Sequence, residues 1–239
     1  MNNHPLARFK NSVSLLRIFN RLLVQHFRFI SMFLPQEKGG VTRSRDMLSL
    51  GSLVSSLREY IYGAVKNKMI EQILEATTMN RDETPKIIIE RFTREKEITD
   101  QKTLALRKSA EQHTVFMQGY SQLKHVPTTN LRPLKPKGAE PFICFEVVLK
   151  NEHVQGLAGP YRQFFTDVSS ELQFKDTKHD QLELLVESPN RVAQVGDHKE
   201  KFCLRASANS AFHLQLFEYL GKLMGMAYRT GTYVLLDLP

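Results

Sequence analysis

Tryptophan is absent from this 239-residue sequence, and cysteine occurs only twice. Two cysteines, Cys144 and Cys203, cannot form a disulfide framework, and the Cys and His residues show no zinc-site spacing. The sequence therefore predicts a protein of a reducing compartment, the cytoplasm or the nucleus, without a structural metal. The longest apolar run, near residues 29–34, is far shorter than the roughly 20 residues that span a bilayer. Basic residues interrupt every candidate secretory signal, so we expect no signal and no transmembrane segment.

Acidic residues are scarce at one end of the chain. Residues 1–45 contain eight Lys or Arg residues and one Asp or Glu, a net charge of +7, which leaves +1 of the total +8 for the rest. The basic excess therefore belongs to an N-terminal arm, and no specific nucleic-acid partner is expected for the chain as a whole. The composition, with 41% hydrophobic and 24% charged residues, is typical of a globular protein.

Recognisable catalytic motifs are also lacking. The sequence contains no glycine-rich phosphate loop, no serine elbow and no close carboxylate pair with an evidently raised pKa. Cys144 has apolar neighbours typical of a core. Cys203 lies in a predicted passage from loop to helix, with His198 and His213 nearby in sequence, which is a weak pattern for a nucleophile. We therefore predict no catalytic, cofactor-binding or metal-binding residue in this chain, and no cofactor.

An apolar period of three to four residues runs through residues 12–34 and predicts an amphipathic helix. Lys10, Arg17, Arg21 and Arg28 are spaced by seven, four and seven positions and form one narrow basic stripe. Two interpretations stay open: a packed helix with a solvated basic face, or a surface for acidic lipid or nucleic acid. The apolar residues of this helix are Leu15, Leu16, Phe19, Leu22, Leu23, Phe27, Ile30 and Phe33.

Four further elements are predicted before a proline-rich stretch. After a linker at 36–46, apolar periodicity predicts a second helix over about 48–76. A β-branched run favours a strand over 86–92, and residues 91–108, rich in both signs of charge, favour a solvated helix. Residues 113–123 predict a helix with one apolar face. That face consists of Val115, Phe116, Gly119, Tyr120 and Leu123.

Prolines exclude regular structure from residues 126–141, which makes this stretch the best candidate for a boundary. Aromatic and β-branched residues then predict a strand over 142–149. Pro160 follows a glycine turn and suits the first position of a helix that ends near Phe174. A second strand is expected over 182–186.

The last part of the chain is dominated by one long helix. It follows a polar loop at 196–201, with Ser210 as its N-cap, and an extended segment follows at 233–239. Gly221 and Gly225 lie four residues apart on this helix and suggest a neighbouring backbone packed very close. Its predicted buried stripe is Phe212, Leu216, Leu220, Leu223, Met224 and Ala227.

Five segments in order resemble the start of a HECT-type ubiquitin ligase domain, and they are most similar to the large, HERC-like members. The pieces include Gly-Leu-Ala-Gly-Pro-Tyr-Arg-Gln-Phe-Phe, Leu-Leu-Val-Glu-Ser-Pro-Asn and Leu-Asp-Leu-Pro. The segments are Phe142–Leu149, Gly156–Phe165, Leu184–Asn190, Phe217–Ala227 and Leu235–Pro239.

The resemblance implies a thioester relay. In this family a conjugating enzyme passes ubiquitin to a cysteine of the C-terminal lobe, which passes it to a substrate lysine. The resemblance places that cysteine beyond Pro239, and neither Cys144 nor Cys203 aligns with it. It therefore implies that this chain is an inactive fragment of a ubiquitin-protein transferase. The partners implied for the whole protein are a ubiquitin-conjugating enzyme, ubiquitin and protein substrates. Arg162, Gly221 and Gly225 match the family pattern, with an expected structural role.

Two departures from the family pattern stand out. The family has Asp-x-Gly-Gly-Pro where this sequence has Gly156 to Pro160, so Ala158 replaces a residue that is free to take positive φ. The Gly-Glu that follows the family's strand appears as Asn151-Glu152. We expect an altered turn at the first position and a mild change at the second.

The predicted fold class is α+β. A mostly helical N-terminal region precedes the first half of a HECT N-terminal lobe, with few strands and two substantial helices. The predicted segments are a basic arm and linker at 1–45, a helical region at 46–140 and the partial lobe at 141–239. The alternative function is a non-catalytic interaction scaffold, in which the Phe19, Phe27 and Phe33 face binds a helical partner.

Overall fold

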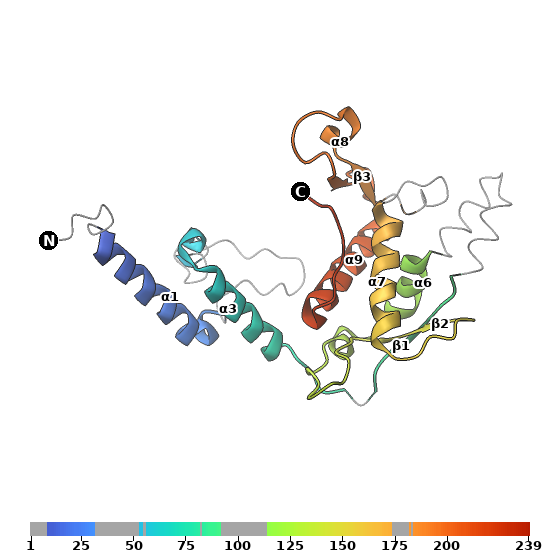
Figure 1. Cartoon of the computed structure of the whole chain (residues 1–239), viewed down its shortest axis with the longest axis horizontal. Coiled ribbons are helices and arrows are strands. Elements are labelled where there is room, and N and C mark those ends of the chain that lie inside the picture. The colour runs from blue at the N-terminus through green and yellow to red at the C-terminus, as the bar shows by residue number, and fades with distance from the viewer. Residues whose placement is uncertain are drawn as a thin grey trace. The chain divides into compact units, whose positions relative to one another are not determined.

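The computed structural model describes residues 9–31, 53–54, 56–81, 83–91, 114–173, 182 and 184–239. The chain divides into two compact units, residues 1–77 and 78–239 (Figure 1). The fold class is α+β, as predicted. The predicted linker at 36–46 and nearly all of the predicted charged helix at 91–108 lie outside the described residues. Segments 1–45, 46–140 and 141–239, defined by composition and resemblance, stay a prediction.

The first unit contains the predicted amphipathic helix, α1 (Lys10–Ser31), paired with α3 (Gly63–Ala76). Its small core is made of Leu23, Phe27 and Ile61, with further apolar side chains packed around them. The proposed partner-binding face of α1 is thus partly occupied within the chain: Phe27 is buried and Phe19 packs against the same core. Phe33 lies outside the described residues.

One buried side chain interrupts the predicted second helix. Asn20 of α1 donates from Nδ2 to the Tyr60 carbonyl oxygen at 2.9 Å and accepts from the Tyr62 N–H at 2.8 Å. Tyr62 is extended, with ψ of 143°, between the short helix η2 (Arg58–Tyr60) and α3. The prediction of one continuous helix over 48–76 is therefore wrong at this point, because Asn20 holds two backbone groups that a helix would need.

The second unit is built around a two-stranded parallel sheet of β1 (Lys86–Ile89) and β2 (Glu146–Leu149), with Lys86 opposite Glu146. Both strands are shorter than predicted. The guanidinium of Arg81 donates to the carbonyl oxygens of Ile143 and Cys144, so this part of the predicted 142–149 strand makes its hydrogen bonds elsewhere.

Helices α6 (Val115–Leu123) and α7 (Ala158–Gln173) pack against the sheet, and α9 (Ala211–Thr230) contributes to the same core. The predicted apolar face of α6 is confirmed residue for residue, and Thr114 caps its N-terminus. α7 begins two residues before Pro160, which costs nothing because the first four N–H groups of a helix have no partner within it. A short helix, η3 (Thr128–Leu131), lies in the proline-rich stretch, so the prediction of no regular structure over 126–141 is wrong there.

A small antiparallel sheet pairs β3 (Leu185–Glu187) with β4 (Phe202–Leu204). β3 corresponds to the strand predicted at 182–186. β4 was not predicted, and it contains Cys203, which therefore lies in a strand rather than in a passage from loop to helix. The short helix α8 (Pro189–Ala193) connects the two strands and is capped by the Ser188 hydroxyl.

The buried face of α9 differs from the predicted one. Ser210 is its N-cap, as predicted, but Phe212 and Met224 are about half exposed. A Cβ built on Gly221 or Gly225 would meet nothing within 4 Å in the described part of the chain, so the close backbone contact predicted there is wrong. The buried residues are Leu216, Tyr219, Leu220, Leu223, Met226 and Ala227.

No helix of the described residues is both long and apolar enough to cross a bilayer.

Candidate functional site

Cys144 lies in the core of the second unit and has no exposed surface. Its N–H faces the Tyr161 hydroxyl at 3.4 Å, and its Sγ lies 3.9 Å from the Met226 carbonyl oxygen. Burial raises the pKa of this thiol to about 11, so it stays protonated at neutral pH. Cys144 is therefore a core residue, as predicted, and its thiol is held in the less reactive protonated form.

Cys203 is half-buried in β4, opposite Val186 of β3. His198 lies in the loop before β4 with a largely exposed side chain, and His213 Nδ1 lies 2.7 Å from the Ser210 hydroxyl. Among the described residues, no hydrogen bond joins either imidazole to Cys203. The sequence neighbours of Cys203 therefore do not form a Cys-His pair with it in this structure.

The described residues contain no group of three or more His, Cys, Asp or Glu side chains arranged to hold a metal ion.

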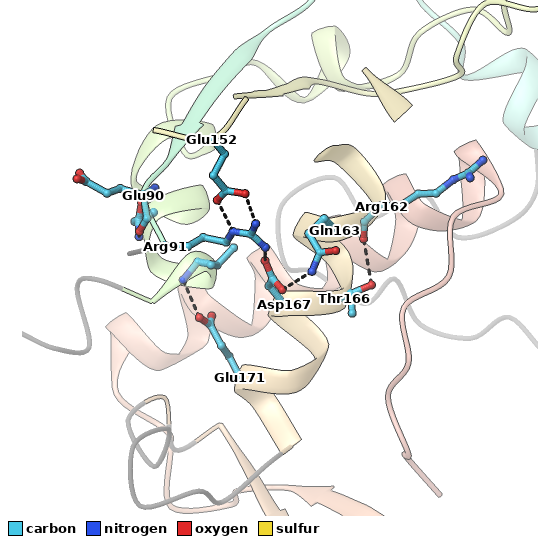
Figure 2. A network of polar contacts seen from close by, with 10 residues as sticks. Glu90, Arg91, Glu152, Arg162, Gln163, Thr166, Asp167 and Glu171 are labelled. Carbon is cyan, nitrogen blue, oxygen red and sulfur yellow. Dashed lines mark hydrogen bonds and ion pairs between the residues drawn. The ribbon is translucent and has the colours of Figure 1, made fainter. Parts of the chain in front are cut away.

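A polar network of the second unit centres on Arg91, which lies two residues after the end of β1 (Figure 2). Its guanidinium binds both carboxylate oxygens of Glu152, after β2, and reaches Asp167 of α7 at 3.2 Å. Gln163 donates to the other oxygen of Asp167 at 2.7 Å. The hydrogen bond to Glu152 contributes most to raising the pKa of Arg91. This network ties the ends of both strands to α7.

Asn151 and Glu152 show why the departure after β2 is mild. Asn151 has φ of 64°, a left-handed conformation that Asn tolerates better than most residues and that glycine adopts freely. The next residue, Glu152, is the main partner of Arg91. The pair therefore fits the same backbone that Gly-Glu would form and places its carboxylate in the network.

At the other departure, a glycine takes the left-handed conformation of the turn. Positive φ occurs at Gly156, at 85°, whereas Ala158 is already the first residue of α7. Ala158 therefore carries no left-handed conformation, and the expected change of the turn relative to the family stays a prediction. The exposed Arg162 side chain points away from Arg91 in Figure 2, while its carbonyl oxygen accepts from the Thr166 hydroxyl at 3.2 Å. A structural role for Arg162 stays a prediction.

Glu171 is a buried carboxylate on the core side of α7, 4% exposed. Its two oxygens accept from the N–H groups of Val115 and Phe116, each at 2.9 Å. These are the first residues of α6, whose first turn has no acidic residue of its own. A negative charge at this point satisfies two unpaired donors and opposes the positive end of the helix dipole. Glu171 thus locks α7 to the start of α6.

The C-terminal segment is held by side chains of α7. Gln173 accepts from the Asp237 N–H at 2.6 Å and donates to the Leu235 carbonyl oxygen, and Ser169 accepts from the Leu235 N–H at 3.1 Å. On β4, the N–H of Phe202 donates to the Asp237 carbonyl oxygen at 2.7 Å. The predicted extended segment therefore runs between α7 and β4.

None of these polar contacts was predicted from the sequence, although the position of one residue indicated such a contact. Glu171 lies on the apolar face of α7, three residues after the buried Val168. No solvent is available at this position to hydrate a charged side chain. An acidic residue at a core position indicates a buried partner. The partners of Arg91 carry no comparable signal, since they are 61 and 76 positions away.

The five segments of the resemblance meet in one core. Phe145, Phe164, Leu184 and Leu223 represent four of them in this cluster, and Leu236 of the fifth packs against it. Edge-to-face contacts join Phe145 to Tyr161 and Phe164, with ring centroids 5.0 and 5.4 Å apart. The five segments therefore share one packed apolar core.

Comparison with known proteins finds E3 ubiquitin-protein ligases among the relatives of this chain. The chain is 32% identical over 129 residues to the human probable E3 ubiquitin-protein ligase HECTD4, a stretch covering 54% of this chain and 3% of that protein. It is 30% identical over 98 residues to human E3 ubiquitin-protein ligase HERC2, covering 41% of this chain and 2% of HERC2, and 29% identical to mouse HERC2. The matched stretch thus spans only a few per cent of the curated relatives.

No protein-family model matches the chain. No solved structure matches it either. The curated relatives nevertheless confirm, over part of this chain, the predicted resemblance to HECT-type, HERC-like ubiquitin ligases.

Proposed function

We propose that this chain is part of a HECT-type ubiquitin-protein transferase and supplies scaffold from the first half of its N-terminal lobe. The observation that carries the proposal is the similarity of 129 residues to a probable E3 ubiquitin-protein ligase. The shared core of the five family-like segments supports it, because those segments pack as one structural unit.

The proposed whole protein works as a thioester relay. The thiolate of an acceptor cysteine attacks the carbonyl carbon of a ubiquitin thioester on the conjugating enzyme, and the thiol of that enzyme leaves. A substrate lysine amine then attacks the new thioester, which forms an isopeptide bond and releases the acceptor thiol. A thiolate suits both steps because it is a good nucleophile at neutral pH and an adequate leaving group.

In this proposal neither cysteine of the chain is the acceptor. The buried, protonated thiol of Cys144 supports this directly, since no macromolecular thioester can reach it. The proposed partners of the whole protein are a ubiquitin-conjugating enzyme, ubiquitin and protein substrates. We place it in the cytoplasm or nucleus, where cysteines stay reduced.

A ubiquitin-loading assay tests the proposal. The 239-residue chain is incubated with activating enzyme, a panel of conjugating enzymes, ATP and ubiquitin, and resolved on a non-reducing gel. We expect no thiol-sensitive adduct on the chain. We expect a longer product of the same gene, if it carries the remaining domain, to form an adduct at a cysteine outside residues 1–239.

Two outcomes contradict the proposal. One is an adduct on the 239-residue chain that disappears in Cys203→Ser, because the acceptor would then lie in this chain. The other is a longer gene product that binds a charged conjugating enzyme without ever forming a thioester. That result favours the alternative function, a non-catalytic interaction scaffold.

A further inference from the structure

Helix α1 presents an apolar ridge that the described residues of its own unit leave uncovered. Leu15, Ile18 and Leu22 are 69%, 56% and 48% exposed. They are spaced by three and four residues, so they lie on one face of the helix. We call these three residues the apolar ridge. It is about 10 Å long, given a rise of 1.5 Å per residue.

A basic ridge lies next to it on the same helix. Lys10, Arg17 and Arg21 are all exposed, and their spacing of seven and four positions aligns them along α1. The first acidic residue of the sequence is Glu37, so α1 contains no carboxylate to neutralise them. Two of the basic residues directly precede ridge residues, Arg17 before Ile18 and Arg21 before Leu22.

The opposite face of α1 is fixed. Leu23 and Phe27 are buried against Ile61, and Asn20 bonds the backbone at Tyr60 and Tyr62. Turning the apolar ridge inward would expose these residues and leave the Asn20 amide unpaired. The helix is therefore held with one apolar and one basic ridge facing outward.

We propose that the two ridges dock α1 onto the surface of an anionic phospholipid bilayer. Helices that lie in the membrane interface place aliphatic side chains at the boundary of headgroups and acyl chains, with Lys and Arg beside the lipid phosphates. The ridges of α1 run along the helix, so the helix lies parallel to the membrane plane. Anionic lipid is the proposed binding partner because its phosphates complement the charges of the basic ridge and its acyl chains accommodate the adjacent apolar ridge.

Other polyanions fit this surface less well. The basic ridge could contact the phosphates of a nucleic acid, but the exposed ridge of Leu and Ile beside it offers no aromatic side chain for base stacking. A helical protein partner is usually matched by charges of both signs beside the apolar seam, whereas α1 carries only positive ones.

The test is vesicle co-sedimentation of the 239-residue chain. Vesicles of phosphatidylcholine alone are compared with vesicles that contain about 30% phosphatidylserine, whose surface attracts basic residues. The ridge variant carries Leu15→Gln, Ile18→Gln and Leu22→Gln. The charge variant carries Arg17→Gln and Arg21→Gln. Because all five side chains are exposed, both variants should keep the circular dichroism spectrum and the unfolding midpoint of the parent chain.

Matched controls alter the same residue types elsewhere. Val192→Gln with Val195→Gln removes two exposed apolar side chains of the second unit, which are 69% and 67% exposed. Lys66→Gln with Lys68→Gln removes two exposed charges of α3. Neither pair belongs to the ridges, so both controls should bind vesicles like the parent chain.

We expect binding to the anionic vesicles and little to the neutral ones. The charge variant should bind roughly twenty-fivefold more weakly, from about fivefold for each of its two basic residues at the surface, and the ridge variant at least tenfold more weakly. Equal binding to both kinds of vesicle overturns the proposal. So does a ridge variant that binds like the parent, because attraction would then be purely electrostatic, and so does binding of duplex DNA in preference to anionic vesicles.

Discussion

The side-chain amide of Gln118 exchanges two hydrogen bonds with the backbone of Glu90. Its Oε1 accepts from the Glu90 N–H at 2.8 Å, and its Nε2 donates to the Glu90 carbonyl oxygen at 3.0 Å. One helical turn on, Gln122 makes the same pair of bonds with Ile88. A glutamine amide has the donor and acceptor pattern of a peptide unit, so α6 takes the place of a neighbouring strand along the outer edge of β1.

Replacing Gln118 and Gln122 by Ala should therefore expose that edge. We expect the double variant to lose about 1–2 kcal/mol of unfolding free energy in urea, since water replaces part of each lost bond. Self-association should rise with concentration, measured by light scattering, because an uncovered strand edge pairs with other chains. Ser121→Ala on the same helix is the control. Equal stability and scattering in both variants would show that the edge needs no cover.

Glu171 gives a second prediction. Glu171→Gln keeps the shape but lacks the charge and one acceptor, so we expect a loss of about 1–2 kcal/mol, and a larger one for Glu171→Ala. Amide hydrogen exchange at Val115 and Phe116 should accelerate in both variants before global unfolding. Glu218→Gln on the exposed side of α9 should change neither measurement. Unchanged exchange at the start of α6 would argue against its capping by Glu171.

Gly119 leaves room for two aromatic side chains. A Cβ at this position would lie 2.6 Å from the Tyr219 hydroxyl oxygen and 2.8 Å from Cζ of Phe164. We expect Gly119→Ala to lower the unfolding free energy by about 1–3 kcal/mol, because two rings must move in a packed core. Gly221→Ala on α9, where the space is open, should instead be stabilising by up to about 1 kcal/mol.

The double variant Gly119→Ala with Tyr219→Phe isolates the first contact. The Tyr219 hydroxyl is buried and has no hydrogen-bond partner among the described residues, so its removal should cost little. We expect it to recover part of the loss, but not all, since the contact with Phe164 remains. A double variant no more stable than Gly119→Ala would show that the Tyr219 hydroxyl is not the group that the new Cβ displaces.

The sequence predicted correctly those features of the fold that depend on residues within a single helix. The face of α6 and the cap at Ser210 follow from spacing and from a local hydroxyl, and both are correct. The break at Tyr62 and the cover of β1 depend on Asn20 and Gln118, whose partners are 42 and 28 positions away. Such long-range side-chain bonds leave no periodic signal in one sequence.

Arg91 supplies a prediction about the network at the end of the sheet. Arg91→Leu should lower the unfolding free energy by about 1–3 kcal/mol, because it leaves the largely buried Glu152 carboxylate without its main partner. Arg162→Leu, an identical change at an exposed guanidinium of α7, should stay within about 0.5 kcal/mol of the parent. Urea unfolding measures the free energy of both variants. Equal losses would contradict the claim that Arg91 stabilises the fold through its partner Glu152.

Cys144 makes the stability of the second unit fall at alkaline pH. Its thiol has a pKa of about 11 in the folded protein against an ordinary value of 9.0, and burial also raises the pKa of the neighbouring Tyr161. The unfolded chain therefore loses protons that the folded one keeps. The contribution of Cys144 is complete below about pH 9 and is lost as the pH rises toward 11, at about 1.4 kcal/mol per pKa unit.

We expect Cys144→Ala, although less stable at pH 7, to show a flatter decline of unfolding free energy between pH 8 and about pH 10.5, where Cys144 begins to titrate in the folded state. Cys203→Ala, the matched control, should decline like the parent. Iodoacetamide at pH 8 should label Cys203 well before Cys144 in the folded chain, because only a thiolate with access to solvent reacts. If both cysteines were labelled at one rate, or if Cys144→Ala kept the full alkaline decline, the buried thiol would not be the titrating group.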